Sequence, residues 1–259
     1  MKIAIIGAGV LGTAIGGLLA AHGYDVDYYD PKIERERLSK VLVDAKYVFL
    51  VVPSQVIPFL LPYFPKDKSL IVASKGFLND AVFSDFKNVI VMSGPGYAED
   101  FKNHRKVELT ITDRQIQKLL DESFITYDYT KDRNGVLMCG SLKNVYAILA
   151  GLWELKPSTS DWRYFIQVAA EEMRDFLALN GSDPGTVDLA CGIKDLKLTC
   201  SYPSRNYEYG DKLRRNASYQ PEKTVEGINT IKRIQRGEAK VPESATYFKQ
   251  LLKEKPKWD

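Results

Sequence analysis

Residues 2–12 of the chain read KIAIIGAGVLG, an apolar run that passes into three closely spaced glycines. Such a run, rich in isoleucine and without a polar side chain after Lys2, predicts a strand buried on both faces. Apolar residues then recur at helical spacing from Val10 to Ala21, and Gly23 is a typical helix-ending residue. A second strand is predicted from Val26 to Tyr29, so the first thirty residues form one strand–helix–strand unit.

The glycine turn has the spacing G-x-G-x-x-G. Glycine permits the sharp passage from strand to helix and leaves the backbone open to a phosphate. The helix N-terminus adds unpaired N–H groups and the positive end of a dipole. Asp30 lies 23 residues after Gly7, where a carboxylate accepts hydrogen bonds from the ribose of a bound dinucleotide. The predicted dinucleotide site comprises Gly7, Gly9, Val10, Leu11, Gly12 and Asp30.

Asp30 also bears on the choice of cofactor. Its carboxylate repels the 2′-phosphate of NADP, so the sequence favours NAD and makes NADP the less suitable partner. Lys32 and Arg35 follow and would soften this preference. The alternative interpretation of Asp30 is a simple turn residue at the end of a strand.

The alternation of strands and helices continues to about residue 132 and then stops. Further strands are predicted at 47–52, 70–73, 89–92, 109–112 and 125–129. Helices dominate afterwards, at 135–155, 159–179, 224–236 and 243–253. The pattern predicts an α/β fold, with an N-terminal Rossmann doubly wound sheet in residues 1–132 and an all-helical domain in residues 133–259.

Composition narrows the class of protein. Of the 259 residues, 45% are hydrophobic and 27% charged, which allows a packed core. The net charge of +3 is too small to indicate a nucleic-acid partner. The apolar helix at 135–155 carries Lys143 and Asn144 near its middle, which favours a core helix over a membrane span. Three cysteines without a C-x-x-C motif and only two histidines predict a cytoplasmic protein with reduced thiols and no metal site.

Further candidate ligand residues follow the later strands. Pro53 ends one predicted strand, Lys75 follows the next, and the turn Gly94-Pro95-Gly96 follows a third. Ligands of such sheets bind at the carboxyl ends of strands, so these residues are predicted to line the nicotinamide and substrate edge of the site. Taken alone, Lys75 is better explained as an exposed loop lysine.

Two groups of residues in the helical part suggest chemistry. Lys143 has the apolar flanks Leu142 and Val145, and desolvation of its ammonium would lower its pKa and ease proton exchange. A lysine that extends to the surface explains the same pattern equally well. Farther on, the run Ser204-Arg205-Asn206 suits a phosphate group, because the arginine fork binds two oxygen atoms.

The order of these motifs resembles the NAD(P)-dependent glycerol-3-phosphate dehydrogenase family from Gly7 to about Gly227. The shared motifs are G-x-G-x-x-G-T-A, V-P-S, S-K-G, S-G-P-x-x-A, L-K-N-V-x-A-I-x-x-G, E-M, D-L-x-L-T-C, S-R-N-x-x-x-G and V-E-G. The L-K-N-V helix, together with D-L-x-L-T-C and S-R-N, is the specific part. The glycine motif alone would not separate this family from many others.

The resemblance implies the reduction of dihydroxyacetone phosphate to sn-glycerol 3-phosphate by hydride from the nicotinamide, and the reverse reaction. It implies Lys143 as the proton donor and acceptor and Asp195 as the residue that orients or balances it. The implied substrate contacts are Lys75, Gly94, Gly96, Ser204, Arg205 and Asn206. Beyond the glycine turn, Asp30 and Pro53, the implied cofactor contacts are Lys75, Ala98, Arg205 and Glu226.

The sequence departs from the family pattern at several positions. Gly96 stands where Ser or Thr is usual, Lys194 replaces a glycine, Ser160 an asparagine and Val168 an arginine. The chain is also shorter than most members, and residues 31–46 lack a familiar loop and strand. Lost polar contacts of this kind can shift preference among small oxo-acids and oxo-phosphates, so the exact substrate stays open.

Two alternatives remain beside a glycerol-3-phosphate dehydrogenase. One is a ketopantoate-reductase-like 2-oxo acid reductase, against which the Ser204-Arg205-Asn206 run argues. The other is an NAD(H)-binding protein without turnover, against which the presence of Lys143 argues. The expected partner is a small phosphorylated substrate, with a possible homodimer by analogy of fold and with neither nucleic acid nor membrane.

Overall fold

The computed structural model describes residues 1–30 and 37–254, so Lys32 and Arg35 lie outside the described residues. The chain forms two compact units that are not consecutive in sequence. The first unit contains Met1–Ser74 and Asp80–Arg133, and the second contains Lys75–Asn79 and Asn134–Asp259. The sequence pattern suggests a single boundary near residue 132, whereas the chain passes between the units three times.

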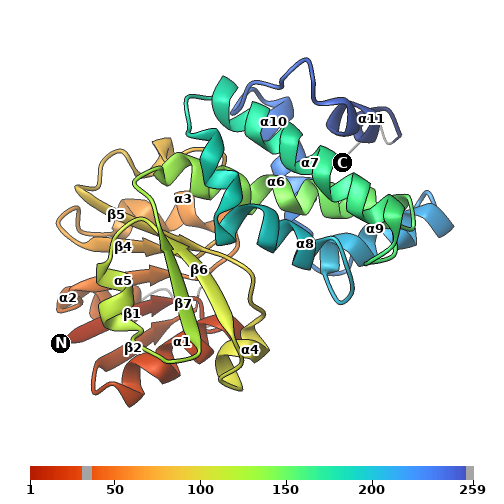
Figure 1. Ribbon diagram of the computed structural model, residues 1–259. Coiled ribbons are helices and arrows are strands. Elements are labelled where there is room, and N and C mark those ends of the chain that lie inside the picture. Colours follow the sequence, from red (N-terminus) through yellow and green to blue (C-terminus); the bar gives the residue numbers. More distant parts are fainter. Residues whose placement is uncertain (31–36, 255–259) are drawn as a thin grey trace. The chain divides into compact units, whose positions relative to one another are not determined.

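The first unit is built on one seven-stranded sheet, shown in Figure 1. Its strands are β1 (Lys2–Ile6), β2 (Asp25–Tyr29), β3 (Tyr47–Leu50), β4 (Ser69–Val72), β5 (Asn88–Ser93), β6 (Val107–Ile111) and β7 (Ile125–Tyr129). They are ordered β2-β1-β3-β4-β5-β6-β7. Neighbours are parallel except β5 and β6, whose antiparallel pairing was not predicted. All seven strands expected from the sequence are present.

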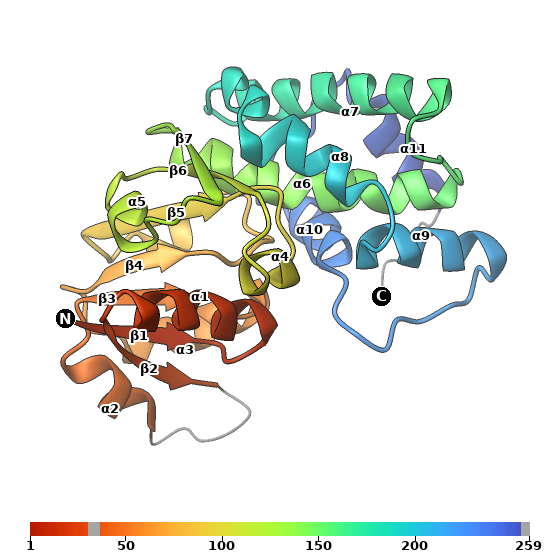
Figure 2. The ribbon, with the colours of Figure 1, turned by 60° about the horizontal axis from the view of Figure 1, so that its bottom comes forward.

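Short helices cover both faces of this sheet. They are α1 (Val10–Ala21), α2 (Arg37–Val43), α3 (Ile57–Leu60), α4 (Ala98–Lys102) and α5 (Gln115–Leu119), with 3-10 turns at Ser54–Val56, Leu61–Tyr63 and Ala81–Phe83. One core cluster joins α1, α4 and α5 to the sheet, and Figure 2 shows α1 along this face. Side chains alternate between the faces of a strand, so Ile3 and Ile5 point to this cluster and Ala4 and Ile6 to the other face.

The order of strands reverses at β1, because α1 leads to β2 on one side and β3 lies on the other. In open α/β sheets the ligand crevice lies at such a reversal, beyond the carboxyl ends of the strands. Gly7 occupies this point with a φ of +109°. A Cβ there would lie 2.6 Å from the carbonyl oxygen of Val51, just after β3. Only glycine therefore fits the turn.

β2 forms an edge of the sheet, since its only strand neighbour in the described part of the chain is β1. Its sequence, DVDYY, places Asp25 and Asp27 on the strand, and Lys2 forms an ion pair with Asp27 at 2.9 Å. Charged side chains on an edge strand discourage pairing with another chain. The composition of β2 therefore suits a strand at which the sheet ends.

The second unit is helical, which confirms the predicted combination of an N-terminal α/β sheet and a helical region. Its elements are α6 (Arg133–Leu152), α7 (Ser160–Leu179), a 3-10 segment (Pro184–Asp188), a π-helical segment (Ala190–Lys194), α8 (Asp195–Thr199), α9 (Arg205–Arg215), α10 (Glu226–Gln235) and α11 (Thr246–Glu254). Within α6, every residue from Gly135 to Gly151 is buried. This helix has the length and hydropathy of a membrane span, but 94% of its most apolar window is buried inside the protein, as in a core helix.

Glycines allow α9 and α10 to approach the backbone of α6 closely. A Cβ on Gly151 of α6 would overlap the carbonyl oxygen of Tyr207 in α9, and one on Gly210 of α9 would overlap the carbonyl oxygen of Ile148. The helix α9 itself was not predicted from the sequence. Its sequence RNYEYGDKLRR has few apolar residues and an internal glycine, so it lacks the usual helical signal.

A buried carboxylate fastens the C-terminal helix. Glu172 of α7 is 3% exposed and accepts hydrogen bonds from the hydroxyls of Tyr146 and Thr246, both at 3.0 Å. It also accepts from the backbone N–H groups of Tyr247 at 2.7 Å and Phe248 at 3.2 Å. These N–H groups belong to the first turn of α11 and have no partner inside the helix. Glu172 therefore ties α6, α7 and α11 into one core.

The contact between α6 and α9 gives a test of packing. The change Gly151→Ala would drive a methyl group into backbone atoms of Tyr207 and Asp211, which cannot move aside as a flexible side chain can. We expect the free energy of unfolding to fall by about 1–3 kcal/mol. Thermal and denaturant unfolding would measure the change.

Gly17→Ala is the matched control. Gly17 is an exposed glycine in α1 whose added Cβ would have no atom within 4 Å. Alanine there should leave stability unchanged or raise it by up to about 1 kcal/mol. Equal effects of the two changes would contradict the close approach of α6 and α9.

Candidate active site

Two lysines and one aspartate form a buried charge cluster in the second unit. The ammonium of Lys143 in α6 and that of Lys75 both pair with the same oxygen, Oδ2 of Asp195, and the Lys75 contact measures 3.3 Å. Lys143 is 2% exposed and Asp195 1%, whereas the Lys75 side chain is 31% exposed. The prediction that Lys143 extends to the surface is therefore wrong, and the buried alternative is confirmed.

Burial lowers the pKa of Lys143 to about 7, because a desolvated ammonium loses its hydration. Asp195 opposes this shift by attraction, and Lys75 adds to it by repulsion. An amine with such a pKa exchanges protons readily near neutral pH. Strongly shifted groups that cluster with a specific charged partner are typical of functional sites.

Asp195 stays ionised in this setting. Burial alone would raise the pKa of its carboxyl, but the adjacent ammonium groups of Lys143 and Lys75 outweigh that effect and lower the pKa below its ordinary value. With both lysines protonated, the cluster carries one excess positive charge. When Lys143 loses one proton, the Lys75 ammonium still neutralises the Asp195 carboxylate. The cluster can therefore release a proton without leaving a buried charge unpaired.

The local backbone places each member of the cluster. Asp195 is the first residue of α8, and the segment before it has a kink at Gly192. A Cβ at position 192 would overlap the carbonyl oxygen of Val187, so the kink requires glycine. On the other side, the Ser141 hydroxyl of α6 donates to the carbonyl of Phe77. This bond holds the segment Lys75–Asn79 on α6 and so fixes the start of the Lys75 side chain.

Thr199 also contacts the cluster, which was not predicted from the sequence. Its hydroxyl donates to the carbonyl of Asp195 at 2.6 Å and lies 3.4 Å from Oδ1 of the same residue. The D-L-x-L-T spacing could have predicted this contact, since Asp195 and Thr199 are four residues apart and such residues share one face of a helix.

The three residues of the Ser204-Arg205-Asn206 run point to different surroundings. Ser204 is buried as the N-cap of α9, and its side chain makes no capping hydrogen bond. Arg205 is exposed. Asn206 turns inward, is 8% exposed, and donates to Oδ1 of Asn144 in α6 at 2.9 Å. The structure therefore brings Asn206 to α6, next in sequence to Lys143, while Arg205 lies on the outside of α9.

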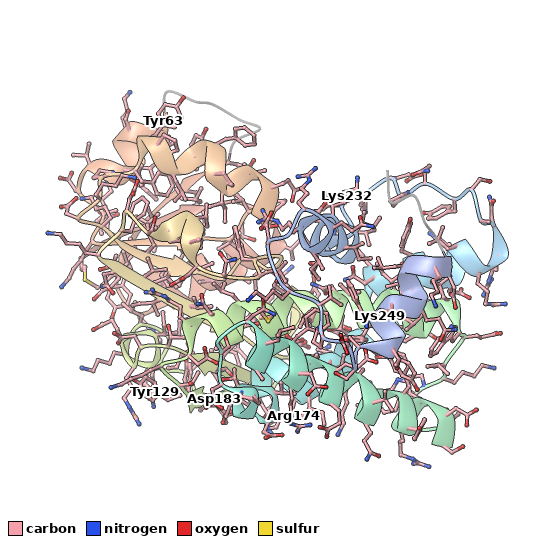
Figure 3. All side chains as sticks on the ribbon, turned by 90° about the horizontal axis from the view of Figure 1, so that it is seen from above. Tyr63, Tyr129, Arg174, Asp183, Lys232 and Lys249 are labelled. Carbon is pink, nitrogen blue, oxygen red and sulfur yellow. The ribbon has the colours of Figure 1, made fainter. Side chains whose placement is uncertain are left out.

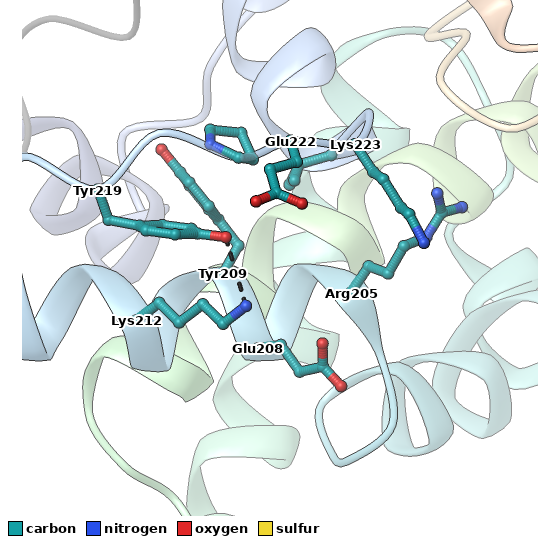
Figure 4. A pocket seen from close by; sticks show the side chains of 9 residues that line it. Arg205, Glu208, Tyr209, Lys212, Tyr219, Glu222 and Lys223 are labelled. Carbon is teal, nitrogen blue, oxygen red and sulfur yellow. Dashed lines mark hydrogen bonds between the residues drawn. The ribbon is translucent and has the colours of Figure 1, made fainter.

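Arg205 lines a small pocket of about 240 Å³, shown in Figure 4. Lys212 forms a hydrogen bond of 3.3 Å to the hydroxyl of Tyr219 on one side. In Figure 4 the side chains of Arg205 and Lys223 lie on the opposite side of the pocket from Lys212. The full lining is Arg205, Glu208, Tyr209, Lys212, Tyr219, Pro221, Glu222, Lys223 and Val225. Three cations against two carboxylates make the pocket weakly attractive to an anion.

The glycine turn of the first unit fits a dinucleotide pyrophosphate. Gly9 is the N-cap of α1, no side chain caps the helix, and a Cβ on Gly9 would meet open space. The first N–H groups of α1, on Val10, Leu11 and Gly12, thus face a site that any side chain at position 9 would fill. A Cβ on Gly12 would overlap the carbonyl oxygen of Gly7, so this glycine serves the close packing of strand and helix.

Asp30 and an apolar pocket follow β2. The Asp30 carboxylate accepts a hydrogen bond of 3.3 Å from the N–H of Ala8, which holds it beside the glycine turn. A cavity of about 700 Å³ begins at Tyr29 and includes the exposed rings of Phe59 and Tyr63. Figure 3 shows Tyr63 at the outer surface. A flat apolar ring such as adenine suits this lining.

The other predicted ligand residues of the first unit lie at strand ends or helix starts. Pro53 is exposed at the start of the turn after β3, and Ala98 begins α4. A Cβ on Gly94 would overlap the carbonyl oxygen of Glu108, so Gly94 serves the pairing of β5 with β6. A Cβ on Gly96 would lie 3.1 Å from the Val107 side chain, which leaves little room for the family's Ser or Thr.

The remaining residues belong to the second unit. Glu226 is the first residue of α10 and is half-buried. Lys194 is exposed just before Asp195, Ser160 is exposed at the start of α7, and Val168 is half-buried in the same helix. The structure thus brings together Lys75, Lys143 and Asp195 in one unit and the glycine turn and Asp30 in the other.

The chain resembles known proteins in sequence and in fold. The family described as "NAD-dependent glycerol-3-phosphate dehydrogenase C-terminus" matches residues 132–249. A glycerol-3-phosphate dehydrogenase [NAD(P)+] of Pseudomonas aeruginosa is 30% identical over 281 residues, which cover 89% of this chain and 83% of the relative. One from Neorickettsia sennetsu is 28% identical over 285 residues, covering 90% and 85%.

Solved structures share the fold. The crystal structure of glycerol-3-phosphate dehydrogenase from Coxiella burnetii has a TM-score of 0.77 at 23% identity and covers 98% of this chain and 95% of its own. Identity over nearly the whole length, the matched C-terminal family and the shared order of motifs lead to one assignment. The chain belongs to the NAD(P)-dependent glycerol-3-phosphate dehydrogenase family.

Proposed function

We propose that this chain is an NAD-dependent oxidoreductase that interconverts dihydroxyacetone phosphate and sn-glycerol 3-phosphate. The observation that carries the proposal is the buried cluster of Lys143, Asp195 and Lys75. It supplies a proton donor with a pKa near neutrality inside a protein of the glycerol-3-phosphate dehydrogenase family.

Reduction of a ketone requires one hydride at the carbonyl carbon and one proton at the oxygen. Reduced nicotinamide, when bound, is the hydride source. The Lys143 ammonium would donate the proton to the forming alkoxide and become a neutral amine. In the reverse direction the neutral amine would accept the hydroxyl proton. Both forms are accessible because burial lowers the pKa of Lys143 to about 7.

Asp195 and Lys75 would support this exchange. Asp195 holds the Lys143 ammonium through its Oδ2 atom and remains a carboxylate throughout. Lys75 balances that carboxylate when Lys143 is neutral, and its partly exposed ammonium can also contact substrate oxygen. A fixed cation near the carbonyl oxygen would stabilise the charge that develops there during hydride transfer.

The substrate phosphate would lie at the start of α9. This helix has eleven residues, and its uncapped first turn attracts an anion. The Ser204 hydroxyl and the Arg205 guanidinium would add hydrogen bonds. For the cofactor we propose Gly7, Gly9, Val10, Leu11, Gly12, Asp30, Pro53, Lys75, Ala98, Arg205 and Glu226. We place this enzyme in the cytoplasm.

NADH oxidation with dihydroxyacetone phosphate tests the proposal, with ketopantoate measured in parallel. Turnover of the phosphate ester alone would support it. Turnover of ketopantoate alone would favour a 2-oxo acid reductase, for which Gly96 in place of a hydroxyl-bearing residue is the one structural argument. Tight NADH binding without turnover of either ketone would indicate a non-catalytic protein.

The change Lys143→Met should remove the chemical step. Methionine fills the same buried space but has no exchangeable proton, and Asp195 keeps Lys75 as a partner. We expect kcat to fall about 10²- to 10⁴-fold, while the Kd for NADH stays near the wild-type value. Steady-state kinetics and a fluorescence titration measure the two quantities. Lys197→Met, an exposed lysine in α8, is the control and should be fully active; retained activity in the Lys143 variant would rule out its role.

The pH dependence should have opposite signs in the two directions. Ketone reduction needs the Lys143 ammonium, so its kcat/KM should fall as the pH rises through about 7. Alcohol oxidation needs the neutral amine, so its kcat/KM should rise through the same pH. Because Lys75 lowers the pKa of Lys143, the Lys75→Gln variant should show both transitions at higher pH. Profiles that change in the same direction would argue against Lys143 as the proton donor.

Asp30 should set a preference for NADH. A carboxylate at the end of β2 repels a 2′-phosphate, so we expect kcat/KM for NADH to exceed that for NADPH by at least about tenfold. Asp30→Ser should reduce this ratio mainly through better use of NADPH. Equal efficiency of the two cofactors with the wild-type protein would contradict the assignment.

A further inference from the structure

A chain of buried amide hydrogen bonds joins α10 to α6. The backbone N–H of Gly227, in the first turn of α10, donates to Oδ1 of Asn206 at 2.9 Å. Nδ2 of Asn206 donates to Oδ1 of Asn144 at 2.9 Å, and Nδ2 of Asn144 donates to the carbonyl of Gly140 at 3.0 Å. Asn144 and Asn206 are 4% and 8% exposed, so water does not compete freely for these bonds.

The backbone fixes the direction of the chain at both ends. The Gly227 N–H can only donate, so Asn206 must face it with its oxygen and turn its nitrogen toward Asn144. The Gly140 carbonyl can only accept, so Asn144 must face it with nitrogen and offer its oxygen to Asn206. A 180° rotation of either amide would place an N–H donor against another donor and an oxygen acceptor against another acceptor. Such unsatisfied contacts are costly in a buried site.

The same contact brings α10 directly onto the catalytic turn of α6. A Cβ on Gly227 would lie 2.6 Å from the Asn144 carbonyl oxygen and 2.6 Å from the Ile148 side chain. Gly227 follows Glu226, the proposed cofactor contact, and Asn144 follows Lys143. Asn206 therefore connects the turn that carries one proposed site residue with the turn that carries the proton donor.

We propose that Asn206 is a positioning residue, which acts on the reaction by fixing the Asn144 amide and the first turn of α10 against α6. This inference rests on the proposed function. It differs from the role that the family resemblance implies for Asn206, a contact to the substrate phosphate. Its acceptor atom and one of its two amide hydrogens are already engaged within the protein.

A substrate without phosphate separates the two roles. The variants are Asn206→Leu, which removes both bonds without adding charge, and Asn206→Asp, which keeps the acceptor but sets an oxygen against Asn144. Each is assayed with dihydroxyacetone phosphate and with dihydroxyacetone, the same ketone without its phosphate. A positioning role predicts that kcat/KM of the Asn206→Leu variant falls by about tenfold or more on both ketones, and by similar factors. A loss confined to the phosphate ester would overturn the proposal.

Asn216→Asp is the control for added charge. Asn216 follows the other end of α9 and is exposed. Its Oδ1 atom accepts hydrogen bonds from the backbone N–H and the hydroxyl of Ser218, and aspartate can accept both, so activity should not change. Dihydroxyacetone carries no charge, so it reports on the Asn206→Asp variant without repulsion of the phosphate. Turnover of dihydroxyacetone at the wild-type rate by both Asn206 variants would refute positioning.

A double-mutant cycle with Asn144→Ala gives a second readout. If Asn206 acts through Asn144, the double variant Asn144→Ala/Asn206→Leu should lose little more kcat/KM and thermal stability than the more damaged single variant. Additive losses in both quantities would overturn the proposal. Failure of the wild-type protein on dihydroxyacetone phosphate would instead reject the proposed function, and the cycle in thermal stability would still report on the amide chain.

Discussion

The pairing of a buried ammonium with a buried carboxylate sets the conditions that the helical unit must meet. Each such ion loses several kcal/mol of hydration when it leaves water. Lys143 and Asp195 offset this loss by direct contact, and the surroundings must then keep water away and keep the contact in place. α6 does so by full burial from Gly135 to Gly151, with α9 and α10 packed against its backbone at glycines. The close helix packing is thus a requirement of the charge cluster as well as a source of stability.

Much of the fold could be predicted from the sequence because the decisive signals are local. The glycines of residues 7–12, the apolar strands and the long apolar helix each depend on neighbouring residues alone. The antiparallel pairing of β5 with β6 depends on a contact between distant residues, and no local pattern encodes its direction. α9 was missed for a related reason: it is stabilised by its contact with α6, which its own polar sequence does not reveal.

The site was predictable in part. Apolar flanks suggested a buried lysine at position 143, but could not decide between burial and extension to the surface. The partner carboxylate lies on a different helix, and only the family resemblance indicated Asp195. The orientation of the Asn206 side chain could not be predicted. Adjacent residues of a helix point about 100° apart, and the sequence does not say which of them faces the core. Asn206 turns to Asn144, while Arg205 beside it lines an exposed pocket.

Because Lys75–Asn79 belong to the helical unit, neither unit can be exchanged as one continuous segment of the chain. A single cut near residue 133 yields a helical fragment without Lys75, and the cluster would keep only Lys143 and Asp195. A lysine paired alone with one carboxylate has a higher pKa, because loss of its proton would leave the buried carboxylate without a cation. Gene fusion or recombination at that boundary would therefore transfer the proton donor without the cation that eases its release. Lys75–Asn79 lie between two segments of the sheet-bearing unit in sequence but belong to the helical unit, so an exchange of either unit must keep these five residues with α6 and α8.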